Sequence, residues 1–380
     1  MKLFLFALSL FVSTLAQAAD ATALLPPPPA PDIAARGFVL MDFQSGQILQ
    51  SLKPDERVDP ASLTKLMTAY LTFTALKQGR LKANQTLPVS EKAWRSEGSR
   101  MFLKLNSQVP VEDLMKGMIV QSGNDACVTL AEGIAGTEQA FAELMNREAK
   151  RLGMQNTNFV NATGLPHAQH YSTAQDLALL TAAIIRDFPE YYPLYSIKEF
   201  SYNNITQPNR NRLLWQDAFV DGVKTGYTEA AGYCLITSAK RNEMRLISVV
   251  LGTASDNART AESQKLLNYG FQFYETYRLY QQGQVVATLP VYKGSANNVK
   301  TGFKHNVFLS LPKGHYQHAK VALTSRQPLL APLMSGQVVG SLTLNVDGKP
   351  VANLPLQALE TVPVAGLFGR MWDSVKLWFK

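Results

Sequence analysis

Residues 60–79, PASLTKLMTAYLTFTALKQG, restrict the possible fold of this chain more than any other stretch. Apolar residues recur every three or four positions and Gly79 follows the last of them, which predicts a helix with an apolar stripe facing a core. The helix opens with Ser62 and Lys65. Residues three apart share one helix face, so these two side chains are expected to be neighbours. The first turn also offers unpaired N–H groups to a negative charge.

The chain starts with a segment typical of exported proteins. Lys2 precedes an apolar stretch that ends in the small-residue cleavage signal AQA. This pattern predicts a signal peptide over residues 1–18 and, in a bacterium, a periplasmic product. A membrane anchor is the alternative, although the apolar run is short for one. The proline-rich residues 19–36 are expected to form an extended spacer.

Strand and helix patterns alternate between residues 37 and 280. Residues 37–52 predict a β-hairpin that turns at Ser45-Gly46, and residues 232–252 predict two strands joined by a charged turn. Helical periodicity marks residues 111–152, interrupted by QSGNDA, residues 172–188, with Ser172 as the expected N-cap, and residues 260–277. We therefore expect an α/β (α+β) catalytic domain over residues 37–280, in which helices flank an antiparallel sheet.

The sequence pattern and the composition change after Tyr280. Short alternating strands, prolines and glycines dominate, as in NVFLSLP and QVVGSLTLNVDG. They predict a small all-β, sandwich-like domain over residues 281–356.

The tail, residues 364–380, predicts an amphipathic helix. Its apolar arc consists of Leu367, Phe368, Met371, Trp372, Val375, Trp378 and Phe379, and its polar arc of Arg370, Asp373, Ser374, Lys376 and Lys380. The helix is too short to span a bilayer, but aromatic residues opposite lysines suit an anionic membrane surface. The protein would then be attached to the outer face of the inner membrane. Packing on its own domain or on a partner is the alternative.

The net charge of +8 at pH 7 admits nucleic acid, an anionic membrane or an acidic polymer as partner. Nucleic acid is excluded because the chain has no RNA-binding aromatic signature, zinc-finger spacing or dense basic run. Two His-x-x-His pairs, at 167–170 and 315–318, lack the neighbouring Cys, Asp or Glu ligands of a good zinc site. We therefore expect neither a metal nor another cofactor. Cys127 and Cys234 can form one bridge or stay two buried thiols.

Three short motifs that can carry chemistry follow one another along the chain. They are Ser62-x-x-Lys65, Ser122-x-Asn124 on a turn of small residues, and Lys224-Thr225-Gly226 before a predicted strand. A serine hydroxyl becomes a nucleophile only when a base takes its proton. A lysine can be that base when burial and a second cation, here Lys224, lower its pKa.

Two further matches lack this context. Ser310-x-x-Lys313 contains Pro312 and lies in the β-rich region, where it cannot open a helix. VKTGF, which includes Lys300, precedes that match with no Ser-x-Asn between them. We interpret both as chance.

The order Ser-x-x-Lys, Ser-x-Asn, Lys-Thr-Gly is that of penicillin-binding proteins and class A β-lactamases. With the surrounding DPASLTKLMT, QSGNDACV and DGVKTGYTEAAGY, and with the basic tail helix, the chain resembles the low-molecular-mass penicillin-binding D-alanyl-D-alanine carboxypeptidases over nearly its whole mature length. Tyr227 departs from the family pattern, since histidine is common at this position in related enzymes.

The resemblance implies a serine peptidase that removes the terminal D-alanine from peptidoglycan pentapeptides. It assigns catalysis to Ser62 as nucleophile, Lys65 as base, Ser122 as proton relay and Asn124 as orienting amide. It assigns substrate binding to Lys224, Thr225, Gly226 and the backbone of Tyr227, with Arg259 as a helper. Penicillins and other β-lactams would acylate the same serine.

Other activities are compatible with parts of this pattern. A D,D-endopeptidase acting on cross-links is poorly separated by sequence, whereas a silent wall-binding scaffold is disfavoured by the complete set of reactive side chains. A class A β-lactamase would need a glutamate for its deacylating water. Glu143 and Asn146 have the wrong spacing, and ATGLPHAQHYSTAQD, expected near the site, contains no glutamate. Rapid β-lactam hydrolysis is therefore not expected.

Overall fold

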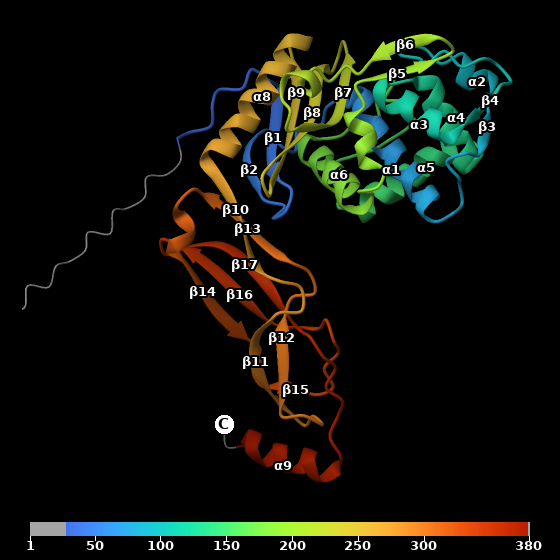
Figure 1. Cartoon of the computed structure of the whole chain (residues 1–380). Helices are drawn as coiled ribbons and strands as arrows, with labels where there is room; N and C mark the ends of the chain where they lie inside the picture. The colour runs from blue at the N-terminus through green and yellow to red at the C-terminus, as the bar shows by residue number, and fades with distance from the viewer. Residues whose placement is uncertain (1–27, 379–380) are drawn as a thin grey trace, which may run out of the picture.

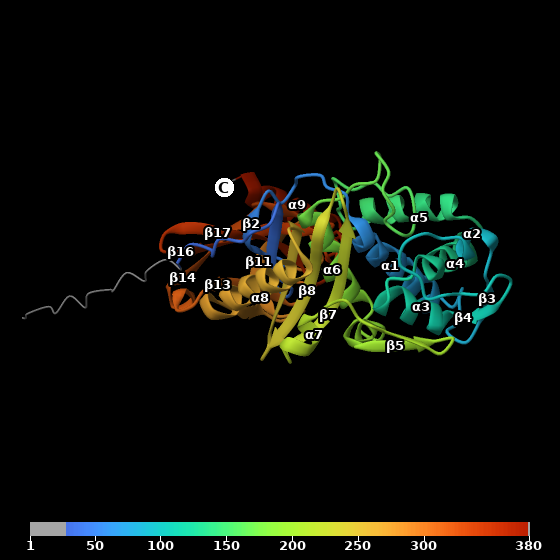
Figure 2. The same ribbon diagram turned by 90° about the horizontal axis from the view of Figure 1, so that it is seen from above.

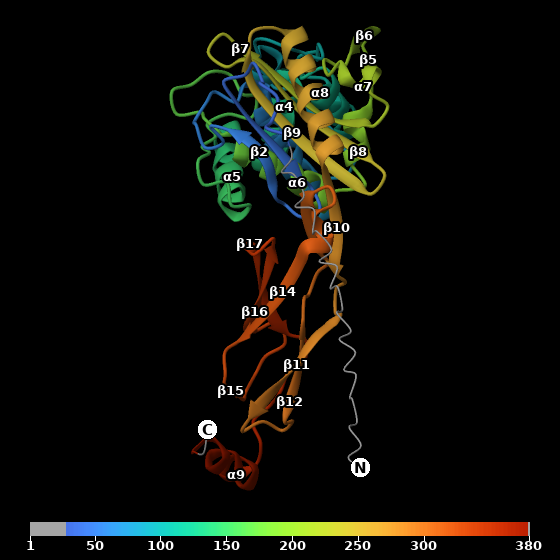
Figure 3. The same cartoon turned by 90° about the vertical axis from the view of Figure 1, so that its left-hand side faces the viewer.

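The computed structural model describes residues 28–378 and consists of two parts that stand end to end (Figure 1). Residues up to Phe273 form an α/β unit, and residues from Tyr274 onward form an elongated β unit (Figure 3). The predicted signal peptide lies outside the described residues. The described part of the predicted spacer is not free, because Ile33 is buried and the backbone carbonyl of Pro28 accepts a hydrogen bond from Tyr269.

A five-stranded antiparallel sheet organises the α/β unit, in the order β2-β1-β9-β8-β7. Its strands are β1 (Gly37–Asp42), β2 (Ile48–Leu52), β7 (Val220–Thr228), β8 (Gly232–Arg241) and β9 (Met244–Thr253). Side chains alternate between its faces, as a strand requires. Val39 and Met41 pack with the helical cluster, whereas Phe38 and Leu40 pack with α8 (Asp256–Phe273) on the opposite face (Figure 2). Strand β7 is an edge.

The helical side is built around α1 (Lys65–Lys77). The other elements are η1 (Ala61–Thr64), α2 (Glu91–Trp94), α3 (Val111–Val120), α4 (Asn124–Ala135), α5 (Glu138–Arg151), α6 (Ala174–Asp187), η2 (Tyr192–Ser196), α7 (Leu213–Gln216), and the hairpins β3 (Thr86–Pro88) with β4 (Gln108–Pro110) and β5 (Glu199–Tyr202) with β6 (Ile205–Pro208). Because α3, α4, α5 and α6 all contact α1, the helix is buried on nearly every side instead of along one stripe.

Two local expectations are corrected. The N-cap of α6 is Thr173, whose side chain accepts from Asp176, and not Ser172. The helix expected to run to residue 277 ends at Phe273. Strand β10 (Tyr274–Tyr280) begins at the next residue, so the strands of the second part start before Tyr280. The predicted domain boundary itself stays a prediction.

The β unit confirms a small all-β domain that follows the α/β fold. Strand β10 pairs with β13 (Val307–Pro312), and the second sheet has the order β14-β16-β17-β12-β11-β15. Its strands are β11 (Val285–Tyr292), β12 (Asn298–Gly302), β14 (Ala319–Ser325), β15 (Leu329–Leu330), β16 (Val338–Val346) and β17 (Lys349–Ala358), and η3 (His315–His318) precedes β14. Leu309 and Leu311 of β13 pack against Leu344 and Val346 of β16. The two sheets therefore share a core.

The two units meet without a linker, since β10 directly follows α8. The side chain of Ser310 lies 2.7 Å from the hydroxyl of Ser45 and 3.0 Å from that of Thr276. The buried carboxylate of Asp42 accepts from both of those hydroxyls, at 2.8 Å each. Ser310 of the discounted Ser-x-x-Lys match is thus part of a polar joint between the units.

Helix α9 (Leu367–Trp378) lies at the end of the β unit farthest from the α/β unit (Figure 3). Asp373, expected on the solvent-facing arc, is buried and accepts from the backbone N–H of Lys293 at 2.6 Å. The apolar arc faces outward, with Leu367, Phe368, Met371, Trp372, Val375 and Trp378 all exposed. Phe379 and Lys380 lie outside the described residues. Within residues 28–378, every helix is too short or too polar to cross a bilayer.

Candidate active site

The first motif lies at a junction of two helix types. Ser62 belongs to the 3₁₀ turn η1, and Lys65 is the first residue of α1. The amine of Lys65 donates to Oγ of Ser62 at 2.9 Å and to the backbone carbonyl of Thr163 at 2.5 Å. The expected Ser–Lys pair is therefore formed, and the segment that contains Thr163 adjoins it as the sequence indicated.

Burial lowers the pKa of the Lys65 amine. Only 2% of this residue is exposed. Removal from water disfavours the charged form and lowers the pKa of Lys65 to about 8, and the charge of Arg210 adds to the lowering. A lysine with such a pKa is partly neutral near pH 7 and can take a proton from the hydroxyl beside it.

The second motif places a hydroxyl beside a second buried amine. Ser122 adopts a left-handed backbone conformation with φ of 62° in the turn between α3 and α4, and such strain is common at functional sites. Its Oγ accepts from Lys224 at 2.9 Å, and Lys224 also donates to the carbonyl of Thr225 at 3.0 Å. Burial, and then repulsion from Lys65, hold the pKa of Lys224 well below its usual range.

Asn124 lines the same cleft, and among residues 28–378 its side chain forms no hydrogen bond with a lysine. Its amide nitrogen donates to the backbone carbonyl of Glu97 at 2.6 Å. Its oxygen Oδ1 is buried and has no hydrogen-bond partner in the part of the chain that the structure describes. A buried acceptor without a partner is costly, so this oxygen is suited to receive an N–H from a bound ligand.

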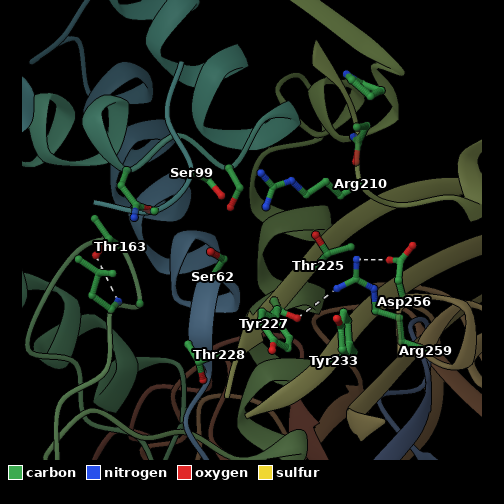
Figure 4. Close-up of a pocket in the computed structure, with 18 of the residues that line it drawn as sticks. Ser62, Ser99, Thr163, Arg210, Thr225, Tyr227, Thr228, Tyr233, Asp256 and Arg259 are labelled. Atoms are coloured by element: carbon green, nitrogen blue, oxygen red, sulfur yellow. Dashed lines mark hydrogen bonds and ion pairs between the residues drawn. The ribbon is translucent and has the colours of Figure 1, made fainter. Parts of the chain in front are cut away.

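Strand β7 carries the third motif along the cleft (Figure 4). Thr225 lines the cleft with its side chain. A Cβ at Gly226 would lie 3.2 Å from both Leu63 Cγ and the Pro60 carbonyl. The missing side chain therefore leaves room for the turn that carries Ser62. Because β7 is an edge strand, its outward backbone groups are available for pairing.

Two further expected site residues make contacts at the mouth of the cleft. Tyr227, 51% exposed, packs against Tyr233 with ring centroids 4.4 Å apart. Arg259 is ion-paired with Asp256, and it donates to the carbonyl of Gly226 at 3.2 Å (Figure 4).

Arg210 is the residue that sequence reasoning missed. It lines the cleft (Figure 4), its side chain is exposed, and it has no hydrogen bond or ion pair with any residue in the described part of the chain. The sequence around it, PNRNR, gave no signal, because an arginine in a polar loop is usually a solvated surface charge.

Seven of the nine expected site residues line one cleft of about 730 Å³. Lys65 and Lys224 are held beneath it by Ser62 and Ser122. Nowhere in residues 28–378 do three or more histidine, cysteine or acidic side chains gather as a metal site would need. Cys127 and Cys234 are separate buried thiols. Burial raises the pKa of Cys127 to about 12, which keeps it protonated.

Two family models match the chain. Residues 25–255 match "D-alanyl-D-alanine carboxypeptidase", and residues 274–364 match "Penicillin-binding protein 5, C-terminal domain". The first match ends just before α8 and the second begins at Tyr274, the first residue of β10, so that α8 lies between them.

Individual proteins agree with these matches. D-alanyl-D-alanine carboxypeptidase DacA of Haemophilus influenzae is 46% identical over 92% of this chain and 91% of its own length. The crystal structure of penicillin-binding protein 5 from Haemophilus influenzae has a TM-score of 0.85 at 45% identity, covering 90% of this chain and all of that one. The ampicillin-bound penicillin-binding protein D2 of Listeria monocytogenes has a TM-score of 0.60 at 32% identity, covering 64% of this chain and all of its own. The chain therefore belongs to the D-alanyl-D-alanine carboxypeptidase family of penicillin-binding proteins.

Proposed function

We propose that this chain is a serine-type D-alanyl-D-alanine carboxypeptidase that removes the terminal D-alanine from peptidoglycan pentapeptide stems through an acyl-enzyme on Ser62. The observation that carries the proposal is the buried amine of Lys65, 2.9 Å from the Ser62 hydroxyl, at the floor of the cleft that also holds Ser122 and Lys224. The Ser62 nucleophile and the Lys65 base are then one hydrogen bond apart, and the Ser122 relay is one hydrogen bond from the bound substrate.

In acylation, neutral Lys65 takes the proton of Ser62 while Oγ attacks the carbonyl carbon of the penultimate D-alanine. The tetrahedral oxyanion is held by the backbone N–H groups of Ser62 and Tyr227, at a helix start and on an edge strand. Pairing of the peptide with β7 fixes its direction along the cleft, as in other complexes in which a peptide joins a sheet edge.

The departing D-alanine needs a proton on its nitrogen and a site for its carboxylate. Ser122 relays the proton, with the Lys224 amine 2.9 Å from its oxygen. Thr225 and Arg210 hold the carboxylate, because Arg210 has no ionic partner among residues 28–378, whereas Arg259 and Arg212 are both paired with Asp256. Asn124 Oδ1 receives the amide N–H of the substrate. Water then hydrolyses the acyl-enzyme.

β-Lactams acylate Ser62 in the same way, and the ampicillin-bound relative supports this part of the proposal. Rapid release is not expected. The backbone carbonyl of Thr163, and not a carboxylate, lies against Lys65, so a class A deacylation base is missing from this position.

Digestion of purified muropeptides, with the products weighed by mass spectrometry, tests the activity. Release of D-alanine alone from pentapeptides is expected, and cleavage of cross-linked dimers would favour the endopeptidase instead. Labelling with a fluorescent penicillin tests the silent scaffold, since a folded protein that stays unlabelled has no working nucleophile. The Ser62→Ala variant should neither label nor release D-alanine.

We place the mature protein in the periplasm, against the outer face of the inner membrane. The predicted signal peptide supports export. The outward apolar arc of α9, with Phe368 89% and Trp378 86% exposed, supports insertion of this helix into the headgroup region. The β unit would then hold the cleft away from the bilayer. Deletion of residues 364–380 should release the protein into the soluble fraction with activity intact, and continued sedimentation with membranes would refute the anchor.

A further inference from the structure

A buried histidine lies behind the proposed catalytic pair. Only 3% of His170 is exposed, and its ring packs edge-on against Phe159 with the centroids 5.7 Å apart. Its Nδ1 accepts from the backbone N–H of Val160 at 3.1 Å. A neutral imidazole that accepts at Nδ1 carries its proton on Nε2. That Nε2–H therefore donates to the hydroxyl of Thr64, 2.7 Å away.

Burial keeps this imidazole neutral. It lowers the pKa of His170 to about 4, and the charges of His167 and Lys65 act in the same direction, against that of Glu138. At the pH of a periplasm the ring is therefore a fixed donor and acceptor, and not a switch. This excludes His170 as the general base and leaves its two hydrogen bonds to be explained.

The two hydrogen bonds of His170 end on the two chain segments that adjoin the lysine. Thr64 is the last residue of the η1 turn that carries Ser62, and it directly precedes Lys65. Val160 opens the segment 160–164, in which the carbonyl of Thr163 accepts from Lys65 at 2.5 Å. Turn and segment are in close contact, because a Cβ at Gly164 would lie 1.8 Å from the Ala61 carbonyl. His170 thus joins the nucleophile's turn to the lysine's acceptor.

Side chains from α5 and α1 fix the rest of the segment. Asn146 makes two hydrogen bonds with the backbone of Phe159, at 2.7 and 2.8 Å. Glu138 accepts from the N–H of Ala162 at 2.9 Å, and Thr68 donates to the carbonyl of Ala162 at 2.7 Å. Thr68 ties the segment to α1, which continues directly from the η1 turn, and His170 adds the hydrogen bond to the turn itself.

We propose that His170 is a positioning residue for the reaction: it holds the Thr163 carbonyl and the Ser62 turn in the register that aims the Lys65 amine at the serine hydroxyl. This inference rests on the proposed function, because it assigns a role relative to Lys65 as base. It predicts an effect on the chemical step, with substrate binding left largely intact, since Thr225 and Arg210 are not attached to His170.

His170→Gln and His170→Asn separate the two hydrogen bonds. Glutamine can still reach Thr64 but leaves Val160 without its acceptor, and asparagine does the reverse. Each variant should lower kcat for D-alanine release by about tenfold through misalignment, with KM within about twofold of wild type. Loss of the Thr163 acceptor removes a hydrogen bond to the charged form of Lys65, so the acid limb of kcat/KM should move to lower pH. His167→Gln, on the exposed side of the same loop, is the matched control and should behave as wild type.

Thr64→Val keeps the shape of the side chain and removes the hydroxyl, so it tests the contact without altering the imidazole. It should reproduce the loss of kcat, Thr64→Ser should recover most of it, and the double variant with His170→Gln should be no slower than the slower single variant. If the folded variants melt at a lower temperature but keep the wild-type kcat and acid limb, His170 is only structural and the proposal is overturned. Wild-type protein that releases no D-alanine and binds no penicillin would instead refute the proposed function.

Discussion

The amine of Lys224 lies 2.9 Å from the hydroxyl oxygen of Ser122, a residue 102 positions earlier in the chain. The contact joins an edge strand of the sheet to a strained turn between two helices. It places a buried amine behind the hydroxyl that faces the leaving group. Ser122 can therefore pass a proton to the departing nitrogen and regain one from Lys224.

Ser122→Ala removes this relay and should lower kcat for D-alanine release by about 10²- to 10⁴-fold, the usual contribution of a proton-transfer group. Acylation by penicillin should slow as well, which stopped-flow fluorescence can measure. Ser99→Ala is the matched control, because Ser99 lines the same cleft but its side chain forms no hydrogen bond with any described residue. A Ser122→Ala variant as fast as the Ser99 control would remove Ser122 from the mechanism.

The pKa of Lys65 predicts how the rate depends on pH. The base must be neutral, so kcat/KM should rise with pH and level off above about pH 8. At pH 7 roughly one lysine in ten is then neutral, against roughly one in three thousand for an ordinary lysine. A profile of kcat/KM from pH 5 to 10 on a D-alanyl-D-alanine peptide measures the midpoint. A midpoint near 10 would mean that Lys65 is not the base.

The same pKa has a consequence for stability. The folded-state pKa of about 8 lies below the unfolded value, so the unfolded chain binds more protons between about pH 8 and 10.5. Lys65 therefore makes stability rise with pH across this window, by up to about 3 kcal/mol. Lys65→Met removes the titration. The difference in unfolding free energy between wild type and variant, measured by urea at several pH values, should change in favour of wild type as pH rises, and a constant difference would contradict the prediction.

Local motifs made most of the site predictable. Ser62, Lys65 and the Lys-Thr-Gly strand were identified because short-range patterns set their local structure. Contacts between distant segments left no such pattern. The position of Arg210 on the cleft and the tight fit of Gly226 against the serine turn each depend on which elements meet in space. The early end of α8 had the same cause, because pairing with β13 turns Tyr274 into a strand residue. The ion pair of Arg259 with Asp256 is instead local, between residues three apart in α8.

Arg210→Gln tests the assignment of the carboxylate site. Loss of an unpaired guanidinium should raise KM for a peptide ending in free D-alanine by about 10- to 100-fold, the worth of a charge-assisted hydrogen bond. A peptide with an amidated C-terminus should be affected far less, because it offers no carboxylate. Arg212→Gln is the control, since Arg212 lines the cleft but is ion-paired with Asp256. Equal effects on both peptides would show that Arg210 does not bind the carboxylate.

The polar joint between the two units gives a prediction about how they unfold. Asp42 is fully buried and accepts from Ser45 and Thr276, and Ser310 connects to both hydroxyls. Asp42→Ala leaves those hydroxyls without their acceptor and should destabilise the joint by about 2–4 kcal/mol, whereas Ser310→Ala should cost about 1 kcal/mol.

Because none of the joint residues lines the cleft, penicillin acylation in solution should stay within about twofold of wild type in both variants. Differential scanning calorimetry is expected to give one transition for wild type, where the joint couples the units, and two for Asp42→Ala, where they melt separately. A single unshifted transition in that variant would mean that the units are held together by their apolar contacts alone. The comparison therefore separates a joint that couples the units from one that merely fills the space between them.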